Sequence, residues 1–169
     1  QLLSLCDRYA WAMEKEGVRF ADRVVVGIRP GVNLVAVTFA LFKLGAVPVF
    51  IDPGMGKSGL LNCIKQARAR IMVAEFKAHV ISYVYKSVFS SIELFLNVGR
   101  ASFGKIHSLQ KGEVNHERFP IVDTQGTDLA AILFTSGSTG PAKGVLYTHS
   151  TFAHQIKMIR CTYEVTDED

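Results

Sequence analysis

The fold is decided by residues 23–51, which read RVVVGIRPGVNLVAVTFALFKLGAVPVFI. The stretch opens with a β-branched run, Arg23–Ile28, which is typical of a strand buried on both faces. Residues 32–44 are mostly apolar and are followed by Gly45, which suits a helix that packs on a sheet and ends in a left-handed turn. Residues 47–51 are a second short apolar run. The stretch therefore predicts a strand, a helix and a strand in succession.

The same alternation extends to both sides of this stretch. Residues 2–16 place apolar side chains at helical spacing and are followed by Gly17, so they predict one amphipathic helix. Residues 58–70 predict another helix, and residues 71–74 predict a third buried strand. Strands and helices that alternate at this spacing are typical of crossover units in a parallel sheet. We therefore expect an α/β fold, with a parallel (mixed-edge) sheet that has helices on both faces.

Residues 135–144, which read TSGSTGPAKG, combine glycines, hydroxyls and one lysine between two strand-like runs, 129–134 and 144–148. Glycines let backbone N–H groups approach an anion closely, the hydroxyls add donors, and Lys143 supplies a positive charge. This composition predicts a cradle for ATP or another polyphosphate. The alternative is a hairpin turn rich in glycine and serine, because turns favour the same residues.

The amino-acid sequence of residues 134–145 closely resembles that of the ATP-phosphate loop of the adenylate-forming superfamily. That superfamily includes acyl-CoA synthetases, the adenylation domains of peptide synthetases, and luciferases. Pro141 stands one place earlier than the family usually has it, which suggests a subgroup. Residues 40–56 are similar to a helix-to-strand segment of the same family that ends in Asp-Pro. Within this segment, residues 51–56, which read IDPGMG, resemble the corresponding sequence of the long-chain acyl branch, which includes the β-lactone synthetases of olefin biosynthesis.

The resemblance implies that the chain is part of the large N-terminal domain of an adenylate-forming enzyme. Such an enzyme would use ATP to activate a carboxylic acid, here a fatty acid, as an acyl-adenylate, and would pass the acyl group to a thiol such as coenzyme A. Mg²⁺ would accompany the nucleotide. The loop residues to which the family match assigns phosphate binding are Thr135, Ser136, Gly137, Ser138, Thr139, Gly140 and Lys143. The family's catalytic and metal-binding residues follow this loop, so we expect none in this chain and expect it to be inactive alone.

A second glycine-rich motif, Gly54–Ser58, follows a predicted strand and opens a predicted helix, as a Walker loop does. Ile51 stands where the first Walker glycine belongs, and Pro53 stiffens the segment that would wrap the phosphates. We expect an ordinary capped turn here, with Ser58 near a helix start and Asp52 capping the turn that follows it. A nucleoside triphosphatase that uses this motif stays open as an alternative function, and so does a non-catalytic α/β module.

Residues 78–98 are rich in valine, isoleucine, leucine and phenylalanine but include Lys86 and Glu93. Each of these charges would cost a few kcal/mol inside a membrane span, so the run predicts an amphipathic helix, with peripheral membrane contact as an open possibility. Residues 99–127 lose this apolar character and predict a linker or mobile loop. This loop would separate a βαβ-type subdomain, 1–98, from residues 128–169, which hold a strand, the phosphate loop, a strand and a helix at 150–161.

The composition bears on nucleic-acid binding and on the cellular compartment. The 169 residues include 19 basic and 15 acidic side chains, scattered along the chain, and the net charge of +4 does not indicate a nucleic-acid surface. Cys6, Cys63 and Cys161 are far apart and lie in helix-like apolar patterns, so we expect buried thiols in a reducing, cytoplasmic compartment. His149 follows the second strand of the loop region, where a capping or packing role is expected rather than catalysis.

Overall fold

The computed structural model describes residues 1–110, 117–135 and 142–166. The strands are β1 (Arg23–Gly27), β2 (Val47–Ile51), β3 (Ile71–Ala74), β4 (Leu94–Asn97), β5 (Ile106–Ser108), β6 (Leu129–Thr135) and β7 (Lys143–Thr148). The helices are α1 (Leu2–Lys15), α2 (Val32–Lys43), α3 (Gly56–Ala67), α4 (Phe76–Val84) and α5 (His149–Tyr163), with a 3₁₀ turn, η1 (Pro53–Met55), before α3.

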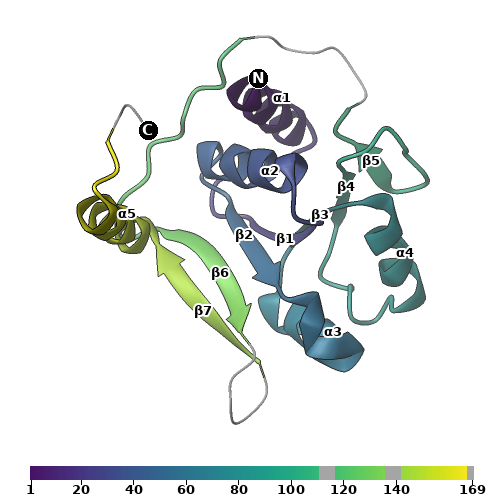
Figure 1. The fold of residues 1–169 in the computed structure, drawn as a ribbon. Coiled ribbons are helices and arrows are strands. Elements are labelled where there is room, and N and C mark those ends of the chain that lie inside the picture. The colour runs from purple at the N-terminus through teal and green to yellow at the C-terminus, as the bar shows by residue number, and fades with distance from the viewer. Residues whose placement is uncertain (111–116, 136–141, 167–169) are drawn as a thin grey trace.

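All seven strands belong to one sheet with the order β5-β4-β3-β1-β2-β6-β7 (Figure 1). Every neighbouring pair from β5 to β6 is parallel, and only the edge pair of β6 and β7 is antiparallel. The expected α/β fold with a mixed edge is therefore confirmed.

The order of the strands places helices on both faces of the sheet. The chain moves from β1 to β2 in one direction, through α2, and then from β2 back past β1 to β3, through α3. Helices α1 and α2 pack with Val24 and Val26 in one core cluster, whereas α3 packs with Val25 in the other. Successive side chains of a strand point to opposite faces, so both faces of β1 are covered and its run of valines is buried throughout.

Gly45 ends α2 in the way that the sequence predicts. Its φ is 64°, in the left-handed region, and its N–H donates to the carbonyl of Phe42 (3.1 Å). A Cβ at this position would lie 2.4 Å from Cδ2 of Phe20. The left-handed backbone therefore favours glycine, and any larger residue would also have to displace the half-exposed Phe20 ring.

The expectation of a single helix over residues 78–98 is wrong. Helix α4 ends at Val84, a turn follows, and Leu94–Asn97 pair in parallel register with Ile71–Ala74 to form β4. The apolar run is long enough for a helix, but its second half gains backbone partners at the open edge of β3, and this tertiary pairing overrides the local pattern. No helix in the described ranges is long and apolar enough to cross a bilayer.

The segment 99–127, expected as a linker or mobile loop, contains β5 and a length of chain that packs on α1 and α2. Phe119 is buried, its N–H donates to Asp7 of α1 (3.2 Å), and its ring contacts Trp11 edge to face at a centroid distance of 4.7 Å. Asp7 in turn accepts from Lys43 of α2 (2.7 Å). Three distant parts of the chain therefore meet at one buried ion pair.

The expectation of three buried thiols holds for Cys6 and Cys63 but is wrong for Cys161, which is exposed. Burial raises the pKa of the first two thiols above the ordinary value. Cys161 lies on α5, a helix with no buried residue, which flanks the β6–β7 edge of the sheet (Figure 1). The apolar residues at helical spacing around Cys161 therefore do not pack against a core within the described chain.

Candidate functional site

Two motifs that are far apart in the sequence emerge side by side at the carboxyl ends of β2 and β6. These strands are parallel neighbours, and Ile51 pairs in register with Phe134. The turn that starts at Asp52 therefore leaves the sheet next to the loop that starts after Thr135. Ligands of open α/β sheets bind outside the carboxyl ends of the strands, so this edge is the expected place for a nucleotide.

The antiparallel pairing of β6 and β7 holds the two ends of the predicted phosphate loop together. Thr135 pairs with Lys143, and both residues are exposed at the ends of their strands. The structure thus brings together the first and last of the predicted phosphate-binding residues. The others, Ser136, Gly137, Ser138, Thr139 and Gly140, lie outside the described residues, and so does Pro141.

The base of this hairpin is packed against the sheet. Phe134 pairs with Gly144, and a Cβ on Gly144 would lie 3.2 Å from both the Phe134 ring and Cγ2 of Ile132. Both neighbours are buried and have little room to move. Phe134 belongs to the core cluster that also includes Met55 and Ala142, which join the loop base to the turn after β2. Sequence analysis missed Phe134 and Gly144 as positioning residues, although the glycine directly after Lys143 was an available signal.

The turn after β2 is capped as expected. The Asp52 carboxylate accepts from the N–H of Gly54 at 2.8 Å, which closes η1, and α3 begins at Gly56 with a φ of 73°.

Lys57, which the alternative Walker motif requires for phosphate, lies over the ring of Tyr85, with a distance of 4.7 Å from its Nζ to the ring centroid. This contact favours a structural role for Lys57.

Lys143 has the environment of a side chain that can receive an anion. It is exposed, and no carboxylate in residues 1–110, 117–135 or 142–166 lies within ion-pair distance of its ammonium group. The same described residues contain no group of three histidine, cysteine, aspartate or glutamate side chains that could hold a metal ion.

His149 occupies the first position of α5 and has the packing role that was expected. The helix is capped by the neighbouring Thr148, whose hydroxyl accepts from the N–H of Thr151 (3.3 Å). The His149 ring lies 6.4 Å from the Phe42 ring, and its backbone N–H donates to the carbonyl of Asp128 (3.1 Å). These contacts fix α5 beside β7.

Known proteins match this chain in sequence. A family model described as AMP-binding enzyme matches residues 1–169. The chain is 36% identical over 160 residues to an olefin beta-lactone synthetase of Stenotrophomonas maltophilia, and the match covers 94% of this chain and 29% of that protein. It is 34% identical over 161 residues to an olefin beta-lactone synthetase of Xanthomonas campestris, with the same two coverages.

Solved structures share the fold. A long-chain-fatty-acid-CoA ligase from Archaeoglobus fulgidus superposes with a TM-score of 0.79 at 25% identity, covering 98% of this chain and 32% of that one. A protein described as a putative long-chain-fatty-acid CoA ligase, from Rhodopseudomonas palustris, gives a TM-score of 0.82 at 15% identity, covering 98% and 41%. The chain thus spans less than a third of the length of the two synthetases and well under half of the length of either ligase.

Proposed function

The chain belongs to the AMP-binding enzyme family, and from this membership we propose that it carries the ATP-phosphate loop of an enzyme that activates a carboxylic acid. One observation carries the proposal. Thr135 and Lys143 face each other at the carboxyl edge of the sheet, both exposed, and hold the two ends of a glycine- and hydroxyl-rich loop. The exposed ammonium group of Lys143 and the hydroxyl of Thr135 are donors of the kind that a polyphosphate requires.

In the proposed reaction a carboxylate oxygen attacks the α-phosphorus of ATP. The new bond joins that oxygen to phosphorus, the bond from phosphorus to the bridging oxygen breaks, and pyrophosphate leaves with the electron pair. Lys143 and Thr135, together with the loop between them, would hold the β- and γ-phosphates and stabilise the charge that grows on the leaving group. Positioning and electrostatic stabilisation supply nearly all of the catalysis in such displacements. Mg²⁺ would arrive with the triphosphate.

We propose a fatty acid as the substrate, and a thiol such as coenzyme A as the acceptor of the acyl group. The named activities of the long-chain ligases support this choice. The identity of 36% and 34% to two olefin beta-lactone synthetases supports a second candidate, in which the acceptor is a hydroxyl of the substrate itself. There the β-hydroxyl oxygen would attack the activated carboxyl carbon, lose its proton, and displace AMP to close the lactone.

The two acceptors are distinguished by the product. The complete protein that contains this chain would be given ATP and a long-chain β-hydroxy acid, with and without coenzyme A, and the products would be separated by mass spectrometry. A thioester that forms only with coenzyme A supports the thiol as acceptor. A lactone that forms equally in both reactions supports the internal hydroxyl.

The adenylation itself is tested by replacing Lys143. In the complete protein, Lys143→Ala should lower acid-dependent exchange between ATP and pyrophosphate by about 100-fold, the order found when one charge-stabilising donor is removed. The midpoint of thermal unfolding should not change, because the side chain is exposed. Lys57→Ala is the matched control and should leave the exchange unchanged.

The opposite pattern would count against this function. Normal exchange by Lys143→Ala would remove the lysine from the mechanism, and loss of exchange in Lys57→Ala would support the Walker motif instead. We also propose that the 169 residues alone are inactive, so measurable exchange by the isolated chain would contradict that part. A cytoplasmic location is proposed from the buried, unreactive thiols of Cys6 and Cys63.

A further inference from the structure

Helix α4 exposes several apolar side chains, together with Lys77, and buries the polar side chains of His79 and Ser82. Phe76, Val80, Tyr83 and Val84 are 42%, 53%, 68% and 68% exposed, and their spacing places them on one face of the helix. His79, which borders this face on the side of β4, is only 1% exposed. A helix on the surface of a soluble domain normally has the reverse arrangement, so this face is suited to an apolar partner.

The orientation of α4 is fixed by hydrogen bonds on its buried side. His79 Nε2 lies 3.0 Å from the carbonyl oxygen of Leu96 in β4, and the Ser82 hydroxyl donates to the carbonyl of His79 at 2.7 Å. The His79 ring also contacts the Phe95 ring at a centroid distance of 5.9 Å. These contacts mean that the helix cannot turn its exposed face inward without leaving buried polar groups unpaired.

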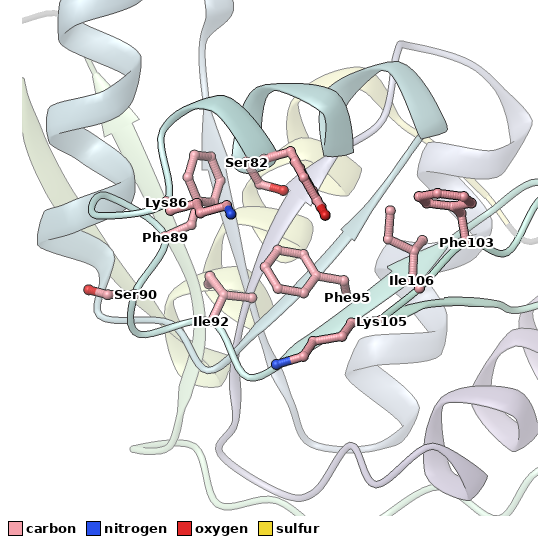
Figure 2. Close-up of a pocket in the computed structure, with 11 residues that line it drawn as sticks. Ser82, Lys86, Phe89, Ser90, Ile92, Phe95, Phe103, Lys105 and Ile106 are labelled. Carbon is pink, nitrogen blue, oxygen red and sulfur yellow. The ribbon is translucent and has the colours of Figure 1, made fainter.

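An apolar groove of about 450 Å³ opens beside this face, between α4, the turn after it and the strands β4 and β5. Figure 2 shows Phe95 in the middle of the groove, Phe103 and Ile106 towards one end, and Phe89 and Ile92 towards the other. Phe103 is itself 67% exposed. The volume falls within the usual range for sites that bind small apolar ligands.

Two lysines, Lys86 and Lys105, line the groove, and no carboxylate is among its lining residues. Lys86 Nζ lies over the Tyr83 ring, 4.9 Å from its centroid, and neither lysine lies within ion-pair distance of a carboxylate in the part of the chain that the structure describes. The nearby acidic side chains are already paired: Glu75 with Arg29 at 2.8 Å, and Glu93 with Arg70 at 3.9 Å. A partner that fits this region is therefore apolar in its interior and anionic at its surface.

We propose that the α4 patch, which consists of Phe76, Val80, Tyr83, Val84 and Phe103, docks on an anionic lipid bilayer. The patch lies among the upper parts of the acyl chains, Lys86 and Lys105 contact lipid phosphates, and the groove accepts one acyl chain. A short helix with an apolar face and flanking lysines has the features of an interfacial membrane helix. The patch lies at the β5 edge of the sheet, and Thr135 and Lys143 lie at the opposite, β6–β7 edge, so docking leaves these two residues uncovered (Figure 1). This inference does not depend on the proposed function.

The test is co-sedimentation of the complete protein with lipid vesicles. One set contains phosphatidylcholine alone, and the other contains equal parts of phosphatidylcholine and phosphatidylglycerol. We expect tighter binding to the anionic vesicles. Lys86→Ala with Lys105→Ala should weaken that binding about 25-fold, from about fivefold for each lysine near an anionic surface. Val80→Ser with Val84→Ser should weaken binding to both sets by about tenfold.

The matched control is Val32→Ser with Val35→Ser, a pair of exposed valines on α2, which should bind vesicles as the unchanged protein does. If the Val80 and Val84 variant unfolds at a lower temperature, Tyr83→Ser alone replaces it, because this side chain is 68% exposed. An unchanged protein that stays in the supernatant overturns the proposal. Normal vesicle binding by the lysine variant or by the valine variant also overturns it. If a variant binds vesicles normally and loses only self-association, measured by light scattering, the patch instead contacts a second copy of the chain.

Discussion

The buried ion pair between Asp7 and Lys43 offers a quantitative test of how the chain is held together. The two side chains are only 8% and 11% exposed, and Asp7 Oδ1 accepts both from Lys43 Nζ at 2.7 Å and from the N–H of Phe119 at 3.2 Å. The pair joins α1, α2 and the segment that leads to β6. Removing one partner would leave the other charge buried, poorly solvated and without its ion-pair partner.

The magnitudes follow from that burial. Among the described residues, Lys43→Met leaves the buried Asp7 carboxylate with only the N–H of Phe119 as a hydrogen-bond donor, so the free energy of unfolding should fall by about 3–5 kcal/mol. Asp7→Asn leaves the ammonium group unpaired and should cost about 3 kcal/mol, the low end of the same range, because the amide oxygen still accepts from Phe119. In the double variant no charge remains, and its cost should be below the sum of the single costs by about 2–3 kcal/mol.

The pair also has a pH dependence with a defined sign. Burial alone would raise the pKa of Asp7, but the hydrogen bonds from Lys43 and Phe119, with the nearby positive charges, hold it below its ordinary value. Its contribution to stability is therefore complete above the ordinary carboxyl pKa and is lost as the pH falls through the lower folded value. Asp7→Asn should lack this contribution.

The assay is urea unfolding of the chain followed by the fluorescence of Trp11, its one tryptophan. This side chain reports on the same region, because its ring contacts Phe119 and its Nε1–H donates to the carbonyl of Glu117 at 3.1 Å. Single costs that add in the double variant, or a Lys43→Met cost below about 1 kcal/mol, would show that water reaches the pair and would refute the reasoning.

Three further predictions concern single positions. Gly144→Val should lower the free energy of unfolding by about 1–3 kcal/mol and reduce pyrophosphate exchange, because its side chain would displace the buried Phe134 ring; unchanged values in urea unfolding and exchange would contradict this. Gly45→Ala should destabilise the chain by at least about 1 kcal/mol, since its left-handed backbone and the Phe20 ring both oppose a Cβ, and an unshifted urea midpoint would oppose this. Burial lowers the pKa of His79, so stability should fall as the pH drops below about 6.5, where only the unfolded state gains the proton. His79→Met should lose that pH dependence, and equal slopes for the two proteins would count against it.

Much of the sheet could be predicted because its strands are buried on both faces. Runs such as Val24–Val26 and Ile71–Ala74 are apolar without interruption, which separates them from the amphipathic helices. The second half of residues 78–98 could not be assigned in this way, because Leu94–Asn97 become a strand only through pairing with β3. The segment around Phe119 likewise has no local pattern, and its position depends on an ion pair between α1 and α2.

The candidate site was predictable in its parts but not in its assembly. Glycines, hydroxyls and Lys143 identify a phosphate loop by composition, and the flanking runs place Thr135 and Lys143 at strand ends. The adjacency of β2 and β6 is a property of the whole sheet, so no local signal brings the turn at Asp52 next to this loop. The packing of Gly144 on Phe134 depends on the same register.

The order of the strands also has a consequence for biosynthesis. As the chain leaves the ribosome, β1, β2 and β3 can pair early, but β2 keeps one side unpaired until β6 has been translated. An open apolar strand edge is a template for pairing with other nascent chains. Slow translation between residues 75 and 128 should therefore increase aggregation, and a chaperone that covers this edge should protect the unfinished polypeptide.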